Sequence, residues 1–212
     1  MTDDDPGRRR RRGREADVDR DARATEKPTT RRRYHRTVTH QGIEIERKFR
    51  LRAAPTAAVL RTVGAVAKHI EQVYLARPGD DPEVGERVRR TATDDGAVTY
   101  RHTTKRRIGA FSFDEREETI DEAAWTEALT HADPARRPVR KTRYVVAHGD
   151  QVLEIDVFEQ PAGLVVAEVE LRDEAEAVDI PAWLGEWLEV TGDPSYLNAS
   201  LARRDAEVPP WA

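Results

Sequence analysis

The chain has 212 residues, of which 36% are charged and 38% hydrophobic, and its mean hydropathy is -0.77. This length predicts one domain or one domain with a tail, and no apolar run approaches the ~18 residues that a transmembrane helix needs. Cysteine is absent, which excludes disulfides, thiolate zinc sites and cysteine nucleophiles and fits a cytoplasmic location. No apolar segment follows the basic run near the N-terminus, so we expect no secretory signal.

The first 36 residues differ in charge from the rest of the chain. They carry a net charge of +5, whereas the remainder carries -9. Val18 is the only branched aliphatic residue among them, so this segment lacks the apolar area that folding requires. We therefore predict a disordered Arg-rich tail over residues 1–38, a folded domain over 39–206 and a flexible C-terminus over 207–212. The arginine run at 8–12 is the one place where we expect contact with nucleic acid or another polyanion; a solvated tail is the simpler interpretation.

After His40 the pattern changes to strands separated by loops and a few helices. Residues 43–51 alternate between apolar and charged side chains, which predicts a strand. Apolar stripes at helical spacing and helix-start signals predict four helices, over residues 55–70, 121–131, 181–190 and 194–204. Turn-rich residues predict loops over 79–85 and 93–96.

Seven predicted strands each place two or three polar, mostly charged residues at alternating positions, so each strand has one charged face. These sets are Glu44/Glu46/Lys48, Arg87/Arg89, Thr103/Lys105, Glu115/Glu117, Lys141/Arg143, Glu154/Asp156 and Glu168/Glu170. Two arrangements satisfy this pattern. Either the charged faces meet water around a shared apolar core, or the sheet closes into a barrel with its charged faces inside and amphipathic helices outside.

The signs of the charges segregate by strand, which favours the closed barrel. Like charges on one strand face lie about 6–7 Å apart and repel unless something lies between them. Divalent metal is the natural mediator for carboxylates, and Mg²⁺ or Mn²⁺ suits oxygen ligands. Phosphate is the natural mediator for arginine and lysine. Together these preferences indicate a site for a metal-bound polyphosphate.

The run Glu44-Ile45-Glu46-Arg47-Lys48 resembles the Glu-x-Glu-x-Lys signature of the CYTH domain family, the triphosphate tunnel metalloenzymes. Further motifs follow in the family's order, from residues 70–75 to residues 196–202, so the resemblance spans residues 41–204. It implies an α+β fold: a closed eight-stranded antiparallel β-barrel, the triphosphate tunnel, with flanking helices. It also implies that both kinds of charge lie inside the barrel.

The activity that the resemblance implies is hydrolysis of inorganic triphosphate to pyrophosphate and phosphate with Mg²⁺ or Mn²⁺, as in stand-alone bacterial members. Four alternatives stay open: a thiamine triphosphatase, a class IV-type adenylate cyclase, an RNA 5′-triphosphatase, and a non-catalytic module that binds polyphosphate or nucleotide. We expect a small-molecule triphosphate as the partner, no membrane partner and no nucleic acid except at the tail. A homodimer is left open.

The resemblance also implies roles for individual residues. Lys48 and Tyr74 resemble the pair that positions or activates the attacking water. The phosphate-binding side is implied to be Arg87, Arg89, Lys105, Lys141 and Arg143, with Arg203 at a tunnel mouth. The metal side is implied to be Glu44, Glu46, Glu154, Asp156, Glu168 and Glu170. Glu115 and Glu117 are implied to bind a second metal or to orient the cations.

One position departs from the family pattern. The family often has arginine two positions before the first glutamate of the fifth strand, where this chain has Phe113. One phosphate-binding cation is therefore missing, or its role has moved to Arg106, Arg107 or Arg116.

Overall fold

The computed structural model describes residues 37–76, 84–109 and 112–211. The tail over residues 1–36 and most of the loop predicted at 79–85 lie outside the described residues. The division into a tail, a folded domain and a C-terminal segment stays a prediction.

Eight long antiparallel strands form the body of the described chain. They are β1 (Thr37–Leu51), β2 (Val66–Tyr74), β3 (Val84–Thr93), β4 (Val98–Arg107), β5 (Ser112–Ile120), β6 (Val139–His148), β7 (Gln151–Gln160) and β8 (Val165–Leu171). Every strand predicted from alternating charge lies within one of them. The turn predicted at 93–96 joins β3 to β4, where the amide of Gly96 donates to the carbonyl of Thr93.

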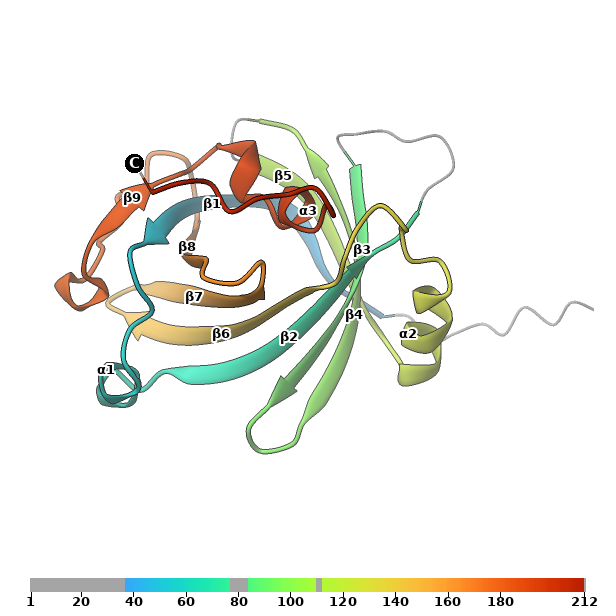
Figure 1. Cartoon of the computed structure of the whole chain (residues 1–212), viewed down its shortest axis with the longest axis horizontal. Helices are drawn as coiled ribbons and strands as arrows, with labels where there is room; N and C mark the ends of the chain where they lie inside the picture. The colour runs from blue at the N-terminus through green and yellow to red at the C-terminus, as the bar shows by residue number, and fades with distance from the viewer. Residues whose placement is uncertain (1–36, 77–83, 110–111, 212) are drawn as a thin grey trace, which may run out of the picture. The chain divides into compact units, whose positions relative to one another are not determined.

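The sheet closes on itself. Its order in the described residues is β5-β4-β3-β2-β6-β7-β8-β1, and β1 pairs with β5 as well as with β8. Residues 37–45 of β1 pair with β5 and residues 45–50 with β8, so one long strand joins both edges of the sheet. Figure 1 shows the resulting ring of strands. The prediction of a closed eight-stranded antiparallel barrel is confirmed.

A ninth, short strand replaces a predicted helix. Residues 181–190 contain only a 3₁₀ turn, η1 (Ala182–Leu184), and then β9 (Trp187–Glu189), so the helix predicted there is wrong. Gly185 adopts φ 75°, a left-handed conformation that ends the turn. β9 pairs with the end of β1, and the rings of Trp187 and Phe49 meet edge to face at 5.4 Å. Trp183 and Leu184 therefore belong to the 3₁₀ turn, whereas Trp187 and Leu188 belong to a strand that extends the sheet.

The first predicted helix, over residues 55–70, is also too long. Helix α1 (Ala57–Thr62) begins where the hydroxyl of Thr56 accepts a bond from the Val59 amide. It ends before Gly64, which has φ 70°, and the β-branched Val66 already belongs to β2. The outward apolar residues of β1, β7 and β8 pack under α1 and η1, with Phe49, Ile155 and Leu60 among the buried members of this cluster.

The helix predicted over residues 121–131 is confirmed as α2 (Glu122–Leu129). The Asp121 carboxylate caps it by accepting a bond from the Ala124 amide at 2.7 Å. Trp125 packs on the outward face of the barrel with Val73, Val88 and Ile120. Figure 1 shows α2 and α1 on opposite sides of the ring of strands. Among the described residues, no helix has the length and apolar character to cross a membrane.

The fourth predicted helix, over residues 194–204, consists of two short pieces, η2 (Pro194–Tyr196) and α3 (Asn198–Leu201). They are separated because Leu197 is extended, with φ -70° and ψ 135°. The segment predicted to be a flexible C-terminus contacts β1 through Pro210 and Trp211. The guanidinium of Arg50 donates to the carbonyl of Pro210 at 2.8 Å and lies 5.3 Å from the centre of the Trp211 ring.

Candidate active site

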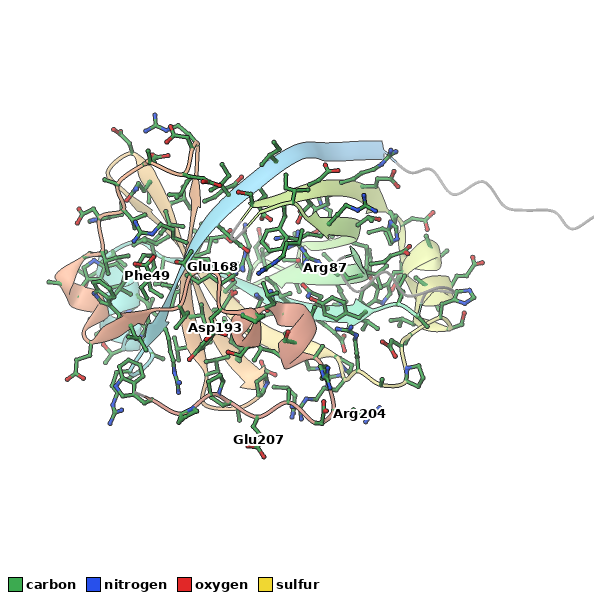
Figure 2. The ribbon with its side chains drawn as sticks, turned by 90° about the horizontal axis from the view of Figure 1, so that it is seen from above. Phe49, Arg87, Glu168, Asp193, Arg204 and Glu207 are labelled. Atoms are coloured by element: carbon green, nitrogen blue, oxygen red, sulfur yellow. The ribbon has the colours of Figure 1, made fainter. Side chains whose placement is uncertain are left out.

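The interior of the barrel holds a cavity of about 580 Å³ whose lining is mostly charged. Its lining comes from the inward faces of the strands and from the segment that contains η2 and α3. Eight lysines and arginines line it: Lys48, Arg87, Arg89, Lys105, Arg107, Arg136, Lys141 and Arg143. Nine carboxylates line it: Glu44, Glu46, Glu86, Glu115, Glu117, Asp133, Glu154, Glu168 and Glu170. Figure 2 shows Arg87 and Glu168 in the interior, whereas Arg204 and Glu207 lie at the periphery.

The charges form two walls. The acidic pairs lie on β7, β8, β1 and β5, which are consecutive neighbours around the barrel. The basic residues lie on β6, β3 and β4, and β2 completes that side of the ring. We call these the acidic wall and the basic wall. Charges that segregate by strand in the sequence therefore segregate by side in the cavity. Lys48, on β1, is the lining cation that an acidic-wall strand contributes.

Lys48 is held within the acidic wall. It is 6% exposed, its ammonium is paired with Glu168, and its Nζ lies 3.2 Å from Glu46 Oε1. Burial disfavours the charged ammonium, but the carboxylates of Glu168 and Glu46 outweigh it and raise the pKa of Lys48. Burial likewise disfavours ionised Glu168, yet Lys48 and Arg143 hold the pKa of that carboxyl well below its usual range. The pair is therefore ionised at neutral pH.

The two walls are joined by ion pairs where β6 meets β7 and β8. Arg143 Nε lies 2.7 Å from Asp156 Oδ1, and Arg143 Nη2 lies 2.6 Å from Glu168 Oε2. Arg143 also pairs with Glu154, and Lys141 pairs with Asp156. Burial, with the neighbouring charge of Arg143, lowers the pKa of Lys141. Carboxylates of the protein thus satisfy both cations of β6.

Close ion pairs and longer contacts occur together where β3 and β4 face β1 and β5. Arg89 Nη2 lies 2.7 Å from Glu117 Oε2, and Lys105 is paired with Glu44. Lys105 Nζ is 3.6 Å from both Glu46 Oε1 and Glu115 Oε2, and Arg87 Nη2 is 3.7 Å from Glu115 Oε2. The last oxygen is buried and has no hydrogen-bond donor.

Tyr74 lies at the end of β2 and is 5% exposed. Its hydroxyl accepts a bond from Gln72 Nε2 at 2.8 Å, and the Arg136 guanidinium lies 5.2 Å from its ring centre. Burial raises the pKa of the Tyr74 phenol, although Arg87 and Lys105 oppose the shift. The phenol is therefore protonated at neutral pH and faces the cavity as a neutral group.

The structure brings fourteen of the sixteen sequence-predicted site residues to the cavity lining. Asp156 is fully buried beside the lining, beneath Lys141 and Arg143. Arg203 does not reach the cavity: its guanidinium pairs with Asp205 at 2.8 Å and its side chain is 61% exposed. The structure therefore does not place Arg203 at a tunnel mouth, because the neighbouring Asp205 holds its side chain at the surface.

Sequence reasoning did not assign Gln72, Asp133 or Arg136, all of which line the cavity. Gln72 alternates with Tyr74 on β2, so its inward direction was readable from the strand pattern. Asp133 and Arg136 lie in the connection between α2 and β6, where no periodic pattern indicates direction. Arg136 reaches the cavity because Asp133 Oδ2 accepts from its Nε at 3.0 Å.

The acidic wall fits a hard divalent cation by chemistry. Its donors are all carboxylate oxygens, the ligands that Mg²⁺ and Mn²⁺ prefer, and Glu115 Oε2 is a buried acceptor with no donor. No three of the described His, Asp and Glu side chains converge as a metal site would require. The ion pairs explain this, since most of these carboxylates are drawn toward lysine or arginine. A metal and its anionic ligand would have to exchange those partners together.

A closed antiparallel barrel whose interior carries facing acidic and basic walls defines a class of charged-tunnel protein. The model of the CYTH domain family matches residues 42–205, which is most of the chain. The chain therefore belongs to the CYTH domain family.

Two solved structures resemble this chain over most of their length. The crystal structure of the inorganic triphosphatase NE1496 is 32% identical with a TM-score of 0.50, and the match covers 79% of this chain and 97% of that one. The PH1819 protein from Pyrococcus horikoshii OT3 is 18% identical with a TM-score of 0.50, over 62% of this chain and 80% of that one. The second likeness, at that identity, shows the fold alone.

A curated relative from Acetivibrio thermocellus, named inorganic triphosphatase, is 42% identical to this chain over 66 residues. The match spans 31% of this chain and 41% of the relative, less than half of its length.

Proposed function

We propose that this chain is a metal-dependent triphosphatase that hydrolyses inorganic triphosphate to pyrophosphate and phosphate. The observation that carries the proposal is the pair of facing walls of opposite charge inside a closed barrel. A cavity built only to bind a polyanion needs cations and gains nothing from a wall of carboxylates. A cavity built for a polyanion together with divalent metal needs both.

The formal charge of the lining supports the need for metal. The described lining has nine carboxylates against eight lysines and arginines, so it is slightly negative. Triphosphate carries about four to five negative charges near neutral pH, because terminal phosphates lose their second proton near there. Bound alone, it would enter a cavity of its own sign. Bound with divalent cations on the acidic wall, it meets a cavity of the opposite sign.

The chain's own residues divide the work by wall. The metal ions would be held by Glu44, Glu46, Glu168 and Glu170. Four further carboxylates pair with the lining cations and would adjust the charge around the metal: Glu115, Glu117, Glu154 and Asp156. A bound divalent ion would supply Lewis-acid polarisation of a phosphoryl oxygen. Arg87, Arg89, Lys105, Lys141 and Arg143 would then exchange carboxylate partners for phosphate oxygens, which guanidinium groups bind in bidentate fashion.

Lys48 and Tyr74 would position the attacking water through hydrogen bonds. Neither group would act as the base that removes its proton. Both groups are protonated at neutral pH, so the ammonium donates hydrogen bonds and the phenol donates or accepts one. Water would form a bond to a terminal phosphorus while the bridging P–O bond breaks, and one proton of the water would pass to a phosphate oxygen or to solvent, which leaves pyrophosphate and phosphate. Phosphoryl transfer of this kind depends mainly on positioning and charge stabilisation, which a closed barrel supplies.

The comparisons support the same activity. NE1496 is named an inorganic triphosphatase and aligns over most of both chains. The Acetivibrio thermocellus relative carries the same name, over the shorter stretch that it shares.

The test is phosphate release by the purified protein from inorganic triphosphate, thiamine triphosphate, ATP and pyrophosphate. Each substrate is assayed with Mg²⁺, with Mn²⁺ and with a chelator. We expect metal-dependent turnover that is fastest on inorganic triphosphate and is lost in the double variant Glu44→Gln/Glu46→Gln. The control is Glu71→Gln, which removes one carboxylate charge from the outer face of β2, where Glu71 pairs with Arg140.

If thiamine triphosphate or ATP is turned over faster, the proposed substrate is wrong, but the proposed class of reaction stands. Absence of turnover on all four substrates, with triphosphate binding retained by calorimetry, would replace the enzyme with a binding module.

A further inference from the structure

The end of the cavity formed by β4 and β5 has a different composition from the rest. Phe113 lies opposite Arg107 on β4 and opposite Glu44 on β1, and all three line the cavity. Phe113 is 6% exposed, and the Arg107 guanidinium lies 5.6 Å from its ring centre. An aromatic ring thus occupies the position where the family often has arginine, and a cation from β4 lies beside it.

The structure distinguishes Arg107 from the other two arginines near this position. Arg106 precedes it on β4 and is exposed on the opposite face of the strand. Arg116 is half exposed and pairs with Glu118 at 2.8 Å. Neither lines the cavity, whereas Arg107 does.

Arg107 also differs from the other cations of the cavity. Each of the other seven lies within 4.0 Å of a described carboxylate: Lys48, Arg87, Arg89, Lys105, Arg136, Lys141 and Arg143. No such pair joins Arg107 to any carboxylate in the part of the chain that the structure describes. Its Nη2 is buried and has no hydrogen-bond acceptor.

This lack of a partner has an energetic consequence. A cation that is already paired must give up its carboxylate before it binds phosphate, so the exchange yields only the difference between two interactions. Arg107 has no carboxylate to give up, and its buried N–H group is left unsatisfied, which is costly until an acceptor arrives. A phosphate oxygen would satisfy that donor at no loss elsewhere.

Phe113 explains how the guanidinium stays in place without an anion. Arginine stacks on aromatic faces, and the contact fixes its plane while leaving its edge N–H groups free to donate. The same ring lies 4.4 Å from Lys105 Nζ, so it contacts both cations that β4 sends into the cavity. A neutral ring also avoids the repulsion that a third cation would cause here.

We propose that Arg107 binds a terminal phosphate group of the triphosphate, with Phe113 as the aromatic support that positions its guanidinium; this assignment rests on the proposed function. The phosphate is terminal because Arg107 is the last residue of β4 and Lys105 precedes it along the same inward face. The row from Lys105 to Arg107 therefore runs toward one end of the cavity.

The experiment measures kcat and KM for inorganic triphosphate, with Mg²⁺, in the full chain and in variants. Arg107→Ala should raise KM about tenfold or more, the usual worth of a hydrogen bond to a charged group, and leave kcat within about twofold. Arg106→Ala is the matched control, one residue away on the outer face, and should change neither constant. Circular dichroism confirms that each variant is folded.

The positioning role of Phe113 has its own readout. Phe113→Leu should raise KM by a smaller factor than Arg107→Ala, and Phe113→Tyr, which keeps the ring, should restore it. In the double variant Arg107→Ala/Phe113→Leu, the loss of the ring should have no further effect on KM. An equal effect of Phe113→Leu with and without Arg107 would overturn the supporting role.

Failure of the inference is distinguishable from failure of the proposed function. If the unaltered chain turns over and Arg107→Ala leaves KM unchanged, Arg107 is not a phosphate ligand and the triphosphatase proposal survives. If the unaltered chain does not turn over, calorimetry with triphosphate decides. Binding weakened about tenfold by Arg107→Ala supports the inference, and equal binding, or no binding at all, overturns it.

Discussion

The barrel interior contains two regions that lie on the same strand faces and have opposite character. The charged cavity gives way to an apolar cluster that includes Val139, Phe158, Val166, Tyr196 and Leu201. On three strands, an apolar and a charged residue two positions apart on the inward face mark the change. These pairs are Val139 and Lys141 on β6, Asp156 and Phe158 on β7, and Val166 and Glu168 on β8. We call the second region the apolar end. A side chain that points into the barrel can therefore line the charged cavity or belong to the apolar end, and its direction alone does not say which.

Lys48 and Arg50 show the difference between the regions most directly. They are two residues apart on the inward face of β1, yet only Lys48 lines the cavity. Arg50 is 8% exposed and donates to Tyr196 Oη at 3.1 Å and to carbonyls of the C-terminal residues. Burying a charge requires partners in either case. Lys48 has carboxylates that can exchange with ligand, whereas Arg50 has fixed neutral acceptors that secure the chain end.

The largest expected effect is a loss of stability when the packing of the apolar end is disrupted. Phe158 is 5% exposed, so Phe158→Ala should lower the free energy of unfolding by about 3–5 kcal/mol through lost burial and a residual cavity. The melting temperature of a domain of this size should fall by about 10 °C. Thermal unfolding followed by circular dichroism measures it. Ile43→Ala, at a 64% exposed position, is the control and should change stability by no more than about 0.5 kcal/mol. Comparable losses in the two variants would contradict a packed apolar end.

The second effect separates the two regions on one strand. Lys48→Ala should lower kcat for triphosphate about 100-fold or more, because it removes a preorganised charge beside the reacting phosphate. Arg50→Ala should affect stability more than turnover, because Arg50 contacts only protein groups. Steady-state kinetics and melting curves on both variants give the comparison. Equal losses of kcat in two folded variants would remove the role assigned to Lys48.

The smallest effect lies outside both regions. Arg47 points outward on β1 and pairs with Glu189 on β9 at 2.6 Å, with both side chains partly exposed. Arg47→Ala should therefore change the free energy of unfolding by no more than about 0.5 kcal/mol. The bond from Arg47 lowers the pKa of Glu189, so this contribution is present at neutral pH and fades as the pH falls below about 4.3, the ordinary glutamate value.

The free energy of unfolding, measured at neutral and at acidic pH, tests the direction of this pH dependence. The difference between Arg47→Ala and the unaltered chain should shrink on acidification. A difference that grows instead would contradict the assignment of the pair.

The strands were predictable because alternation is a local property. Glu44, Glu46 and Lys48 share one face of β1 whatever lies around them, since successive side chains on a strand point in opposite directions. The same logic placed the pairs on β3, β5, β6 and β8. The helices were less predictable. Gly64 and Gly185 end their turns through left-handed backbone, and Trp187 reads equally well as part of a helix or of an edge strand.

The sequence did not predict whether an individual arginine outside the strands reaches the cavity. Arg203 was expected at a tunnel mouth, but the local carboxylate of Asp205 holds it at the surface. Arg136 reaches the cavity from a loop whose sequence carries no periodic signal. Arg107 was one of three candidates to replace the missing cation near Phe113; it shares a strand face with Lys105, and the structure shows that it lines the cavity.

Alternation along the chain is enough to show that each strand has one charged face and that the sign of the charge is uniform within most strands. Which strands are neighbours is known only from the folded barrel. The sheet order places β7, β8, β1 and β5 together and β6, β2, β3 and β4 together, which gathers the carboxylates on one wall and the cations on the other. That gathering depends on pairings between segments far apart in the chain, such as β1 with β5 and β8, and no local pattern encodes them. The physical reason is that strand direction follows from backbone geometry, whereas strand partners follow from the packing of the whole barrel.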